Sequence, residues 1–157
     1  MPAAALRLRL ADPADAPAIR ALTRAAYAKW VPLIGREPKP MGADYEAAVR
    51  LHRFDVLEAE GVLAALLETI PAADHLLVEN LAVAPAFQRR GLGRRLMAQA
   101  EHLARAAGLS QVRLYTNARF TENIRLYASL GYAETGREAL PVGVAVHMAK
   151  TLPPTGP

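Results

Sequence analysis

The sequence of 157 residues contains no cysteine. It therefore excludes disulfide frameworks, thiolate metal sites and a cysteine nucleophile. It also has no run of about 18 apolar residues, so we expect no membrane span. Its N-terminus lacks the long apolar core that follows the basic start of a secretory signal. From these absences we expect a cytoplasmic protein.

Charged residues are also few, at 22% of the chain, which is too low a fraction for a disordered tail protein. Hydrophobic residues make up 52% of the chain, which is typical of a globular protein. The length fits one domain with a sizeable core. We expect that domain to span residues 1–150, with a flexible tail at 151–157 that contains three prolines and a glycine within its last six residues. The net charge of +4 is a mild excess and does not by itself identify a partner.

The hydrophobic pattern predicts strands and helices in an α/β arrangement, with a mixed sheet and helices on its faces. The segment 31–42 has three prolines and two glycines, so we expect a loop there, and long ordered loops are often functional. Strands are expected at 6–10, 54–59, 62–69, 75–85, 111–116, 132–138 and 142–152, and helices at 14–30, 43–53, 120–131 and from the basic stretch below to about Ala107.

A stretch rich in arginine and glycine, "AFQRRGLGRRLM" at 86–97, lies between a predicted strand and a predicted helix. Glycines at a helix start allow a ligand to approach open backbone N–H groups, and the helix N-terminus favours an anion. The stretch is neither a P-loop, since no Lys-Ser or Lys-Thr follows, nor a dinucleotide fingerprint, since Leu96 takes the third glycine position. A pyrophosphate site and a solvated arginine face both fit. Nucleic-acid binding ranks last, because Phe87 is the one aromatic residue in 86–95.

The spacing Gln88-Arg89-Arg90-Gly91-Leu92-Gly93 after "ENLAVAP" resembles the acetyl-CoA signature of the GNAT N-acetyltransferases. The segment "NARFTENIRLYASLGY" at 117–132 resembles the second signature of that family. The resemblance implies a mostly antiparallel mixed sheet flanked by helices and splayed between the strands at 75–83 and 111–116. It also implies acetyl-CoA as cosubstrate and suggests a homodimer.

The resemblance further implies the cosubstrate contacts. The pantetheine arm is expected along Leu81, Ala82 and Val83. The pyrophosphate is expected at Gln88, Arg89, Arg90, Gly91, Leu92, Gly93 and Arg94. Asn117 could bond the cosubstrate or shape its loop, and Asn123 matches a position that often bonds the pantetheine arm, although each could be only a turn or cap residue.

Forming an amide from a thioester requires a general base for the amine and a general acid for the leaving thiolate. The second signature implies Tyr127 as the acid. Glu79 is the candidate base, because a carboxylate in an apolar strand is costly unless it is paired or useful, and it could act through water. A structural ion pair at Glu79 and a packed core role for Tyr127 stay open, as does His147 as an alternative base.

The acceptor side is expected to involve Trp30, Tyr45, His147 and the loop at 34–41, which would suit a small polar amine. No cluster of His, Asp and Glu at ligand spacing appears, so we predict no metal. Without cysteine or a nucleophile-elbow serine, we expect direct attack of a small-molecule or peptide amine on the acetyl group. The alternative is a non-catalytic module that binds acyl-CoA.

Overall fold

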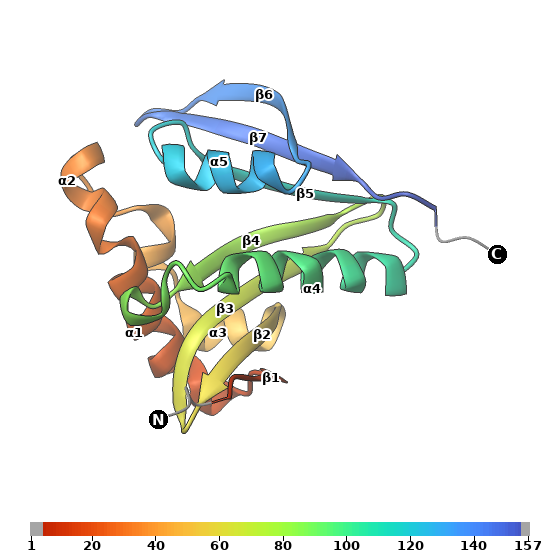
Figure 1. The fold of residues 1–157 in the computed structure, drawn as a ribbon. Coiled ribbons are helices and arrows are strands. Elements are labelled where there is room, and N and C mark those ends of the chain that lie inside the picture. Colours follow the sequence, from red (N-terminus) through yellow and green to blue (C-terminus); the bar gives the residue numbers. More distant parts are fainter. Residues whose placement is uncertain (1–4, 155–157) are drawn as a thin grey trace. The chain divides into compact units, whose positions relative to one another are not determined.

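The computed structural model describes residues 5–154, and Figure 1 shows their helices and strands. The strand order is β1-β2-β3-β4-β5-β7-β6. The pair β4·β5 is parallel, whereas β1·β2, β2·β3, β5·β7 and β6·β7 are antiparallel. The predicted mixed, mostly antiparallel sheet with flanking helices is confirmed. The strands are β1 Arg7–Leu10, β2 Arg53–Ala59, β3 Val62–Pro71, β4 Leu76–Val83, β5 Gln111–Asn117, β6 Ala133–Ala139 and β7 Val144–Thr151, and the α-helices are α1 Ala16–Tyr27, α2 Val31–Ile34, α3 Tyr45–Leu51, α4 Leu92–Ala106 and α5 Thr121–Ser129.

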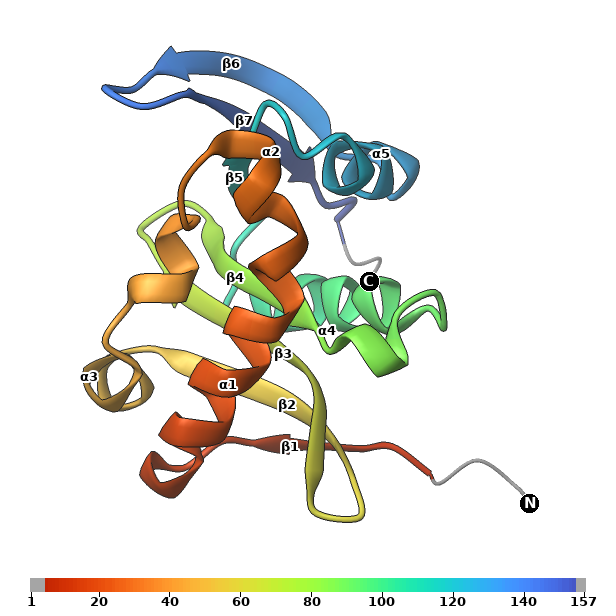
Figure 2. The same cartoon turned by 90° about the vertical axis from the view of Figure 1, so that its left-hand side faces the viewer.

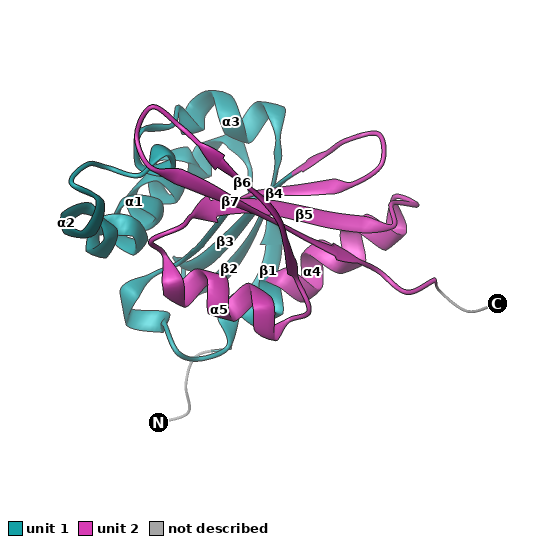
Figure 3. Ribbon diagram, turned by 90° about the horizontal axis from the view of Figure 1, so that it is seen from above, with its two compact units in different colours: residues 1–69, 80–96 teal, residues 70–79, 97–157 magenta. Residues whose placement is uncertain are grey.

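The chain forms two compact units, which Figure 3 colours separately. Unit 1 comprises residues up to Thr69 together with Asn80–Leu96, and unit 2 comprises Ile70–Glu79 together with the chain from Met97 onward. Strand β4 and helix α4 each contribute residues to both units. The predicted single domain over 1–150 stays a prediction, and each unit is described by itself.

The core of unit 1 is formed where α1 and α3 pack on the strands (Figure 2). Ile19 and Leu22 of α1 face this core at helical spacing and are 0% and 6% exposed. They pack with Tyr45 of α3 and with Phe54 and Val56 of β2. The apolar stripe of α1 is therefore its buried face.

Two aspartates, Asp12 and Asp15, form the entry into α1. Asp12 accepts a hydrogen bond from the Ala14 N–H at 2.8 Å, and the Asp15 carboxylate accepts one from the Asp12 N–H at 2.9 Å. This reciprocal pair is a capping box around the short 3₁₀ turn Pro13–Asp15, and it directs the chain from β1 into α1.

The segment 31–42 is not the uninterrupted loop that was expected. Val31–Ile34 forms the single turn α2, with Pro32 in its first turn, where proline is tolerated. A 3₁₀ turn follows at Lys39–Gly42. Arg24 of α1 holds the segment, donating to the Glu37 carboxylate at 2.7 Å and to the Met41 carbonyl at 3.0 Å. The proline and glycine content therefore marks short turns that are fixed to α1.

In unit 2, Val112 and Leu114 of β5 and Val146 and Met148 of β7 are all buried, on the strands that pair in register. Glu101 of α4 accepts hydrogen bonds from the Tyr132 hydroxyl at 3.2 Å and from the Lys150 ammonium at 2.9 Å. Because Lys150 belongs to β7, these bonds tie α4 to the sheet of unit 2.

The C-terminal end of α4 is closed by a left-handed glycine. Gly108 has a φ of +73°, and the Leu109 N–H reaches back to the Ala104 carbonyl at 2.8 Å. A left-handed residue with this bond is the turn that commonly ends a helix. The helix boundary read from the sequence is thus confirmed within a residue.

The last strand runs slightly further than the predicted domain boundary. Thr151 belongs to β7, and Leu152 is 5% exposed with its N–H bonded to the Ser110 carbonyl at 2.8 Å. The remainder of the predicted tail at 155–157, and the first four residues of the N-terminal stretch, lie outside the described residues.

Candidate functional site

The stretch after β4 turns sharply before α4 begins, and all of this turn belongs to unit 1. Arg89 and Gly91 both have positive φ angles, +63° and +79°. A left-handed conformation is uncommon for a residue with a Cβ, so the backbone at Arg89 is unusual. An ideal Cβ on Gly91 would meet no atom within 4 Å, so its φ, rather than crowding, favours glycine there.

The first intrahelical bond of α4 runs from the Arg95 N–H to the Gly91 carbonyl at 3.0 Å. In general, the N–H groups of the first turn of an α-helix precede its first intrahelical bond and point toward the helix N-terminus. The Arg90 guanidinium lies 5.5 Å from the Phe87 ring centroid, a cation–π distance. The predicted order of strand, glycine turn and helix N-terminus is present, which is the local geometry of an anion site.

Strand β4 alternates regularly between buried and half-exposed residues. Glu79, Leu81 and Val83 occupy the half-exposed face, as predicted, and Ala82 lies on the buried face. The Val83 carbonyl accepts a hydrogen bond from the Gln88 side chain at 3.1 Å. Gln88 therefore fixes the end of β4, and its role in cosubstrate binding stays a prediction.

Asn80, which the sequence analysis did not single out, is 3% exposed and lies at the centre of a polar network in unit 1. Its carbonyl oxygen accepts from the Tyr27 hydroxyl at 2.9 Å. Its amide donates to the Tyr45 hydroxyl at 3.2 Å and to Thr23 Oγ1 at 3.4 Å. The signal in the sequence was an amide on the buried face of an otherwise apolar strand.

Tyr45 completes this network, since its hydroxyl donates to the Pro40 carbonyl at 2.7 Å. Tyr45 is 1% exposed, and its ring packs edge-on against Phe54. Trp30 is 8% exposed, with the Lys29 ammonium 4.9 Å from its ring centroid. The contacts of both aromatic residues are those of packed core side chains, and their predicted acceptor contacts stay predictions.

Glu79 belongs to unit 2, and it accepts a hydrogen bond from the Tyr115 hydroxyl at 3.1 Å. Tyr115 lies on β5, two residues after Arg113 and therefore on the same face of the strand. The sequence analysis missed Tyr115, although the alternation in "QVRLYTN" places it with Arg113. The candidate base is thus oriented by a phenol.

Tyr127 lies on α5 in unit 2, and it is 7% exposed. Its ring packs edge-on against Tyr132 with centroids 6.3 Å apart. Burial raises the pKa of the Tyr127 phenol above its usual value. The phenol keeps its proton at neutral pH, as a general acid must.

The two candidate asparagines differ in their surroundings. The Asn117 side chain accepts from the Arg119 N–H at 2.9 Å, and the Asn117 carbonyl accepts from the Phe120 N–H at 2.9 Å. Of the two roles left open by the sequence, Asn117 has the loop-shaping contacts. Asn123 is half-buried in the first turns of α5, and its cosubstrate role stays a prediction.

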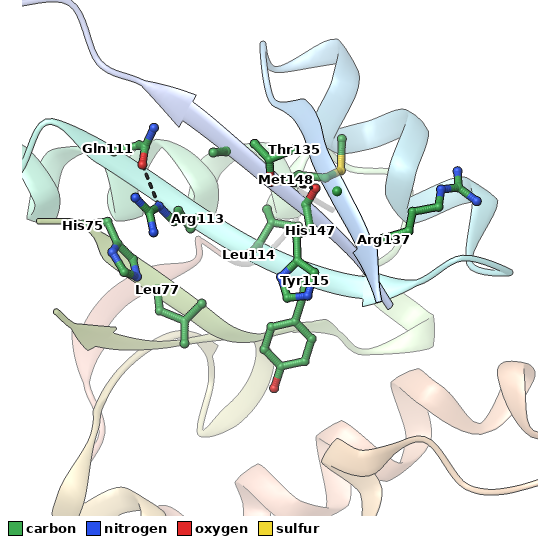
Figure 4. Close-up of a pocket in the computed structure, with 12 residues that line it drawn as sticks. His75, Leu77, Gln111, Arg113, Leu114, Tyr115, Thr135, Arg137, His147 and Met148 are labelled. Atoms are coloured by element: carbon green, nitrogen blue, oxygen red, sulfur yellow. Dashed lines mark hydrogen bonds between the residues drawn. The ribbon is translucent and has the colours of Figure 1, made fainter. Parts of the chain in front are cut away.

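His147 lies on β7, with its Nε2 3.2 Å from a Glu138 carboxylate oxygen and its ring centroid 6.0 Å from that of Tyr115. It lines a cavity on the sheet of unit 2, together with Tyr115, and Figure 4 shows the two rings next to each other. His147 therefore lies at a cavity wall, and its predicted acceptor role stays a prediction.

A family model described as acetyltransferase (GNAT) family matches residues 18–132. The chain belongs to this family. The matched range includes both signatures that carried the resemblance, so the family prediction is confirmed. The assignment makes the protein a transferase of the acyltransferase class by family.

The structure of this GNAT chain is similar to that of the ribosomal-protein-S18-alanine N-acetyltransferase from Escherichia coli, with a TM-score of 0.79, 23% identity and coverage of 97% of each chain. It is also similar to yncA, a putative acetyltransferase from Salmonella typhimurium solved with acetyl-CoA, with a TM-score of 0.73, 21% identity and coverage of 98% of this chain and 97% of that one. At these identities the likeness establishes the fold.

A curated relative, N-acetyltransferase family 8 member 3 of Rattus norvegicus, is 30% identical over 89 residues. The matched region covers 53% of this chain and 39% of the rat protein. The chain thus spans well under half the length of that relative, and the family alone is carried over from it.

Two absences concern residues 5–154 only. No group of three or more potential ligand side chains is placed to hold a metal ion in this part of the chain. None of its helices combines the length and the apolar character needed to cross a bilayer. The compartment and the homodimer stay predictions.

Proposed function

We propose that this GNAT chain transfers the acetyl group of acetyl-CoA to a primary amine by direct attack. The observation that carries the proposal is the turn at Gln88–Gly91, where two left-handed residues lead into the N-terminus of α4. Backbone N–H groups and the helix dipole at such a terminus stabilise a phosphate group. The acetyl-CoA bound by the Salmonella relative supports the same cosubstrate here.

The residues of this turn fit a pyrophosphate. Gly91 leaves open space where a side chain would stand, so a phosphate oxygen can approach the backbone. Arg89, Arg90 and Arg94 add positive charge close to the turn. Leu81 and Val83 are the half-exposed residues of β4 along which the pantetheine arm would run.

Acetyl-CoA supplies an activated thioester when it is bound. Glu79 takes a proton from the amine, directly or through water, so that the nitrogen lone pair can attack the thioester carbon. As the carbon–sulfur bond breaks, the Tyr127 phenol gives its proton to the sulfur. Burial raises the pKa of the Tyr127 phenol, so the phenol is protonated at neutral pH before the thiolate forms.

The proposal is tested by calorimetry with acetyl-CoA followed by thiol release with a panel of amines. We expect Tyr127→Phe to lower kcat by about 10²–10³-fold, as for other general acids, while the Kd for acetyl-CoA changes less than about threefold. Glu79→Gln should lower kcat as well and alter the pH–rate profile.

Three outcomes separate the alternatives. Binding of acetyl-CoA without thiol release for any amine would favour the non-catalytic module. Unchanged turnover in Tyr127→Phe would remove that residue as the acid. No binding of acetyl-CoA would contradict the assignment of the turn at Gln88–Gly91.

A further inference from the structure

Tyr27, the last residue of α1, contacts β4, the strand along which the proposed function places the pantetheine arm. The Tyr27 hydroxyl donates to the Asn80 side-chain oxygen at 2.9 Å and lies 3.5 Å from the Leu81 carbonyl oxygen. Asn80 and Leu81 are consecutive residues of β4, and both belong to unit 1, as α1 does. One hydroxyl group therefore contacts two neighbouring positions of the strand.

The other contacts of Asn80 fix the direction of the shorter bond. The Asn80 amide nitrogen donates to Thr23 Oγ1 at 3.4 Å and to the Tyr45 hydroxyl at 3.2 Å. The amide oxygen can only accept, so the Tyr27 hydroxyl donates its single proton toward β4. Because Asn80 is 3% exposed, the loss of one of its partners is costly. The bond between Tyr27 and Asn80 consequently holds α1 and β4 together.

Thr23 and Tyr27 approach β4 from the same face of α1. They are four positions apart in the sequence, a spacing that brings side chains next to each other on a helix. Thr23 is fully buried, and the half-buried Tyr27 ring packs against the hydrophobic core of unit 1. Packing of the ring therefore fixes the place of the Tyr27 hydroxyl.

The last residues of β4 have further contacts within unit 1. Ala82 is 2% exposed and belongs to the hydrophobic core. The Val83 carbonyl accepts from the Gln88 side chain at 3.1 Å, and the Ala84 N–H donates to the Ala64 carbonyl at 2.8 Å. These contacts fix the strand without using the side chains of Leu81 and Val83 on its half-exposed face.

A strand whose backbone is already fixed binds an extended ligand more tightly than a mobile strand does. Main-chain hydrogen bonds supply much of the affinity when an extended ligand lies beside a strand. These bonds need carbonyl and N–H groups in one orientation, and ordering them at the moment of binding lowers the affinity. The contact of Tyr27 with the Leu81 carbonyl is a contact with such a main-chain group.

We propose that Tyr27 is a positioning residue for the cosubstrate, whose hydroxyl holds β4 at Asn80 and Leu81 in the conformation that binds the pantetheine arm. The proposal rests on the proposed function and adds to it a residue that acts through the strand. It assigns to Tyr27 an effect on the affinity for acetyl-CoA rather than on the rate of acetyl transfer.

The test compares two variants of the full chain that each remove one hydroxyl group from the same network. Tyr27→Phe keeps the ring and loses the contacts with Asn80 and Leu81, whereas Thr23→Val loses the contact with Asn80. We expect the Kd for acetyl-CoA, measured by calorimetry, to rise about three- to tenfold in Tyr27→Phe, as for the loss of one hydrogen bond. In Thr23→Val it should change less than about twofold. Thermal unfolding verifies that both variants are folded.

A fragment of the cosubstrate separates the strand from the turn at Gln88–Gly91. ADP contains a pyrophosphate but no pantetheine arm, so Tyr27→Phe should change its Kd, measured by displacement of acetyl-CoA, less than about twofold. Gly91→Val should weaken the binding of ADP and acetyl-CoA alike. With an amine that is acetylated, Tyr27→Phe should raise the KM for acetyl-CoA and leave kcat within about twofold of the parent value.

An unchanged Kd for acetyl-CoA in Tyr27→Phe would overturn the positioning role and leave acetyl transfer standing. Equal weakening in Thr23→Val, or equal weakening of ADP and acetyl-CoA in Tyr27→Phe, would also overturn it, since either result indicates a general loss of structure. If ADP binds too weakly to measure, the comparison of Tyr27→Phe with Thr23→Val decides. Failure of the parent chain to bind acetyl-CoA would overturn the proposed function, and the positioning role with it.

Discussion

Unit 1 places polar side chains in its interior, whereas unit 2 presents them on an open sheet face. The buried polar or charged residues of the described chain, tyrosines aside, all belong to unit 1: Thr23, Asp55, Glu68, Thr69 and Asn80. In unit 2, Arg113, Arg137, His75 and His147 line a cavity (Figure 4). Val112 and Val146, on strands β5 and β7 of the same unit, are buried.

The difference follows from what each polar group requires. A buried amide or carboxylate is costly unless its partners are fixed, so Asn80 has three side-chain partners and Glu68 lies 2.6 Å from the His52 ring nitrogen. Groups on an open face keep their water and can exchange it for a ligand. We therefore expect substitutions inside unit 1 to change stability and substitutions on the open face of unit 2 to change acceptor use.

The largest effect on stability is expected for Asn80→Ala. The change removes the hydrogen bond that Asn80 accepts from the Tyr27 hydroxyl and the two that its amide donates to the hydroxyl groups of Thr23 and Tyr45. We expect the free energy of unfolding, measured in urea, to fall by about 2–3 kcal/mol. Arg113→Gln is the matched change in unit 2 and should cost less than about 0.5 kcal/mol. Similar losses in the two variants would break the comparison.

A change at Gly91 tests whether the turn at Gln88–Gly91 binds acetyl-CoA through its backbone rather than through arginine side chains. A β-branched residue is strained at a φ of +79°, so Gly91→Val should shift the turn and weaken acetyl-CoA binding about tenfold, which calorimetry measures. Arg95→Ala, beyond the turn, should change the Kd less than twofold. A stronger effect at Arg95 than at Gly91 would assign the binding to arginine side chains instead.

A smaller effect is expected for Tyr115→Phe on the open face of unit 2. The variant keeps the ring next to His147 and removes the hydrogen bond to Glu79. A hydrogen bond to a charged group orients the carboxylate, so we expect kcat to fall about three- to tenfold with the KM for acetyl-CoA unchanged. Steady-state kinetics separates the two constants. A raised KM with normal kcat would show that Tyr115 acts in binding rather than in positioning Glu79.

Local signals were sufficient to predict most of the fold. The alternation in β4 and the glycine at the end of α4 depend on neighbours in the sequence, and both agree with the structure. The segment 31–42 was predicted as a loop because proline and glycine permit both loops and single helical turns. Arg24 of α1 also holds the segment, by hydrogen bonds to Glu37 and Met41, which lie 13 and 17 positions further along the chain and which a local pattern does not reveal.

The site was harder to predict than the fold, because its contacts join distant parts of the chain. The turn at Gln88–Gly91 is local, so the sequence could locate it. The bond between Tyr115 and Glu79 spans 36 positions and depends on the pairing of β4 with β5. The sequence assigned Tyr45 to the acceptor side because its side chain is aromatic. In the structure, the Tyr45 hydroxyl forms hydrogen bonds in the buried network around Asn80.

The smallest effect is expected for a partly exposed ion pair of unit 1, Arg9 and Asp15, whose side chains are 25% and 16% exposed. Arg9 donates to both oxygens of Asp15, at 2.8 Å and 3.0 Å, and this hydrogen bonding lowers the pKa of the Asp15 carboxyl below its usual value. A carboxyl whose pKa is lowered by folding contributes stability above its unfolded pKa of about 3.9, and that contribution is lost as the pH falls through the folded value. We therefore expect Asp15→Asn to destabilise the protein by about 0.5–1 kcal/mol at pH 7 and by progressively less below about pH 4, as measured by urea unfolding across pH. A loss at pH 7 as large as that in Asn80→Ala would mean that surface and interior polar groups contribute alike in unit 1. A loss that does not shrink at low pH would show that the ion pair is not its source.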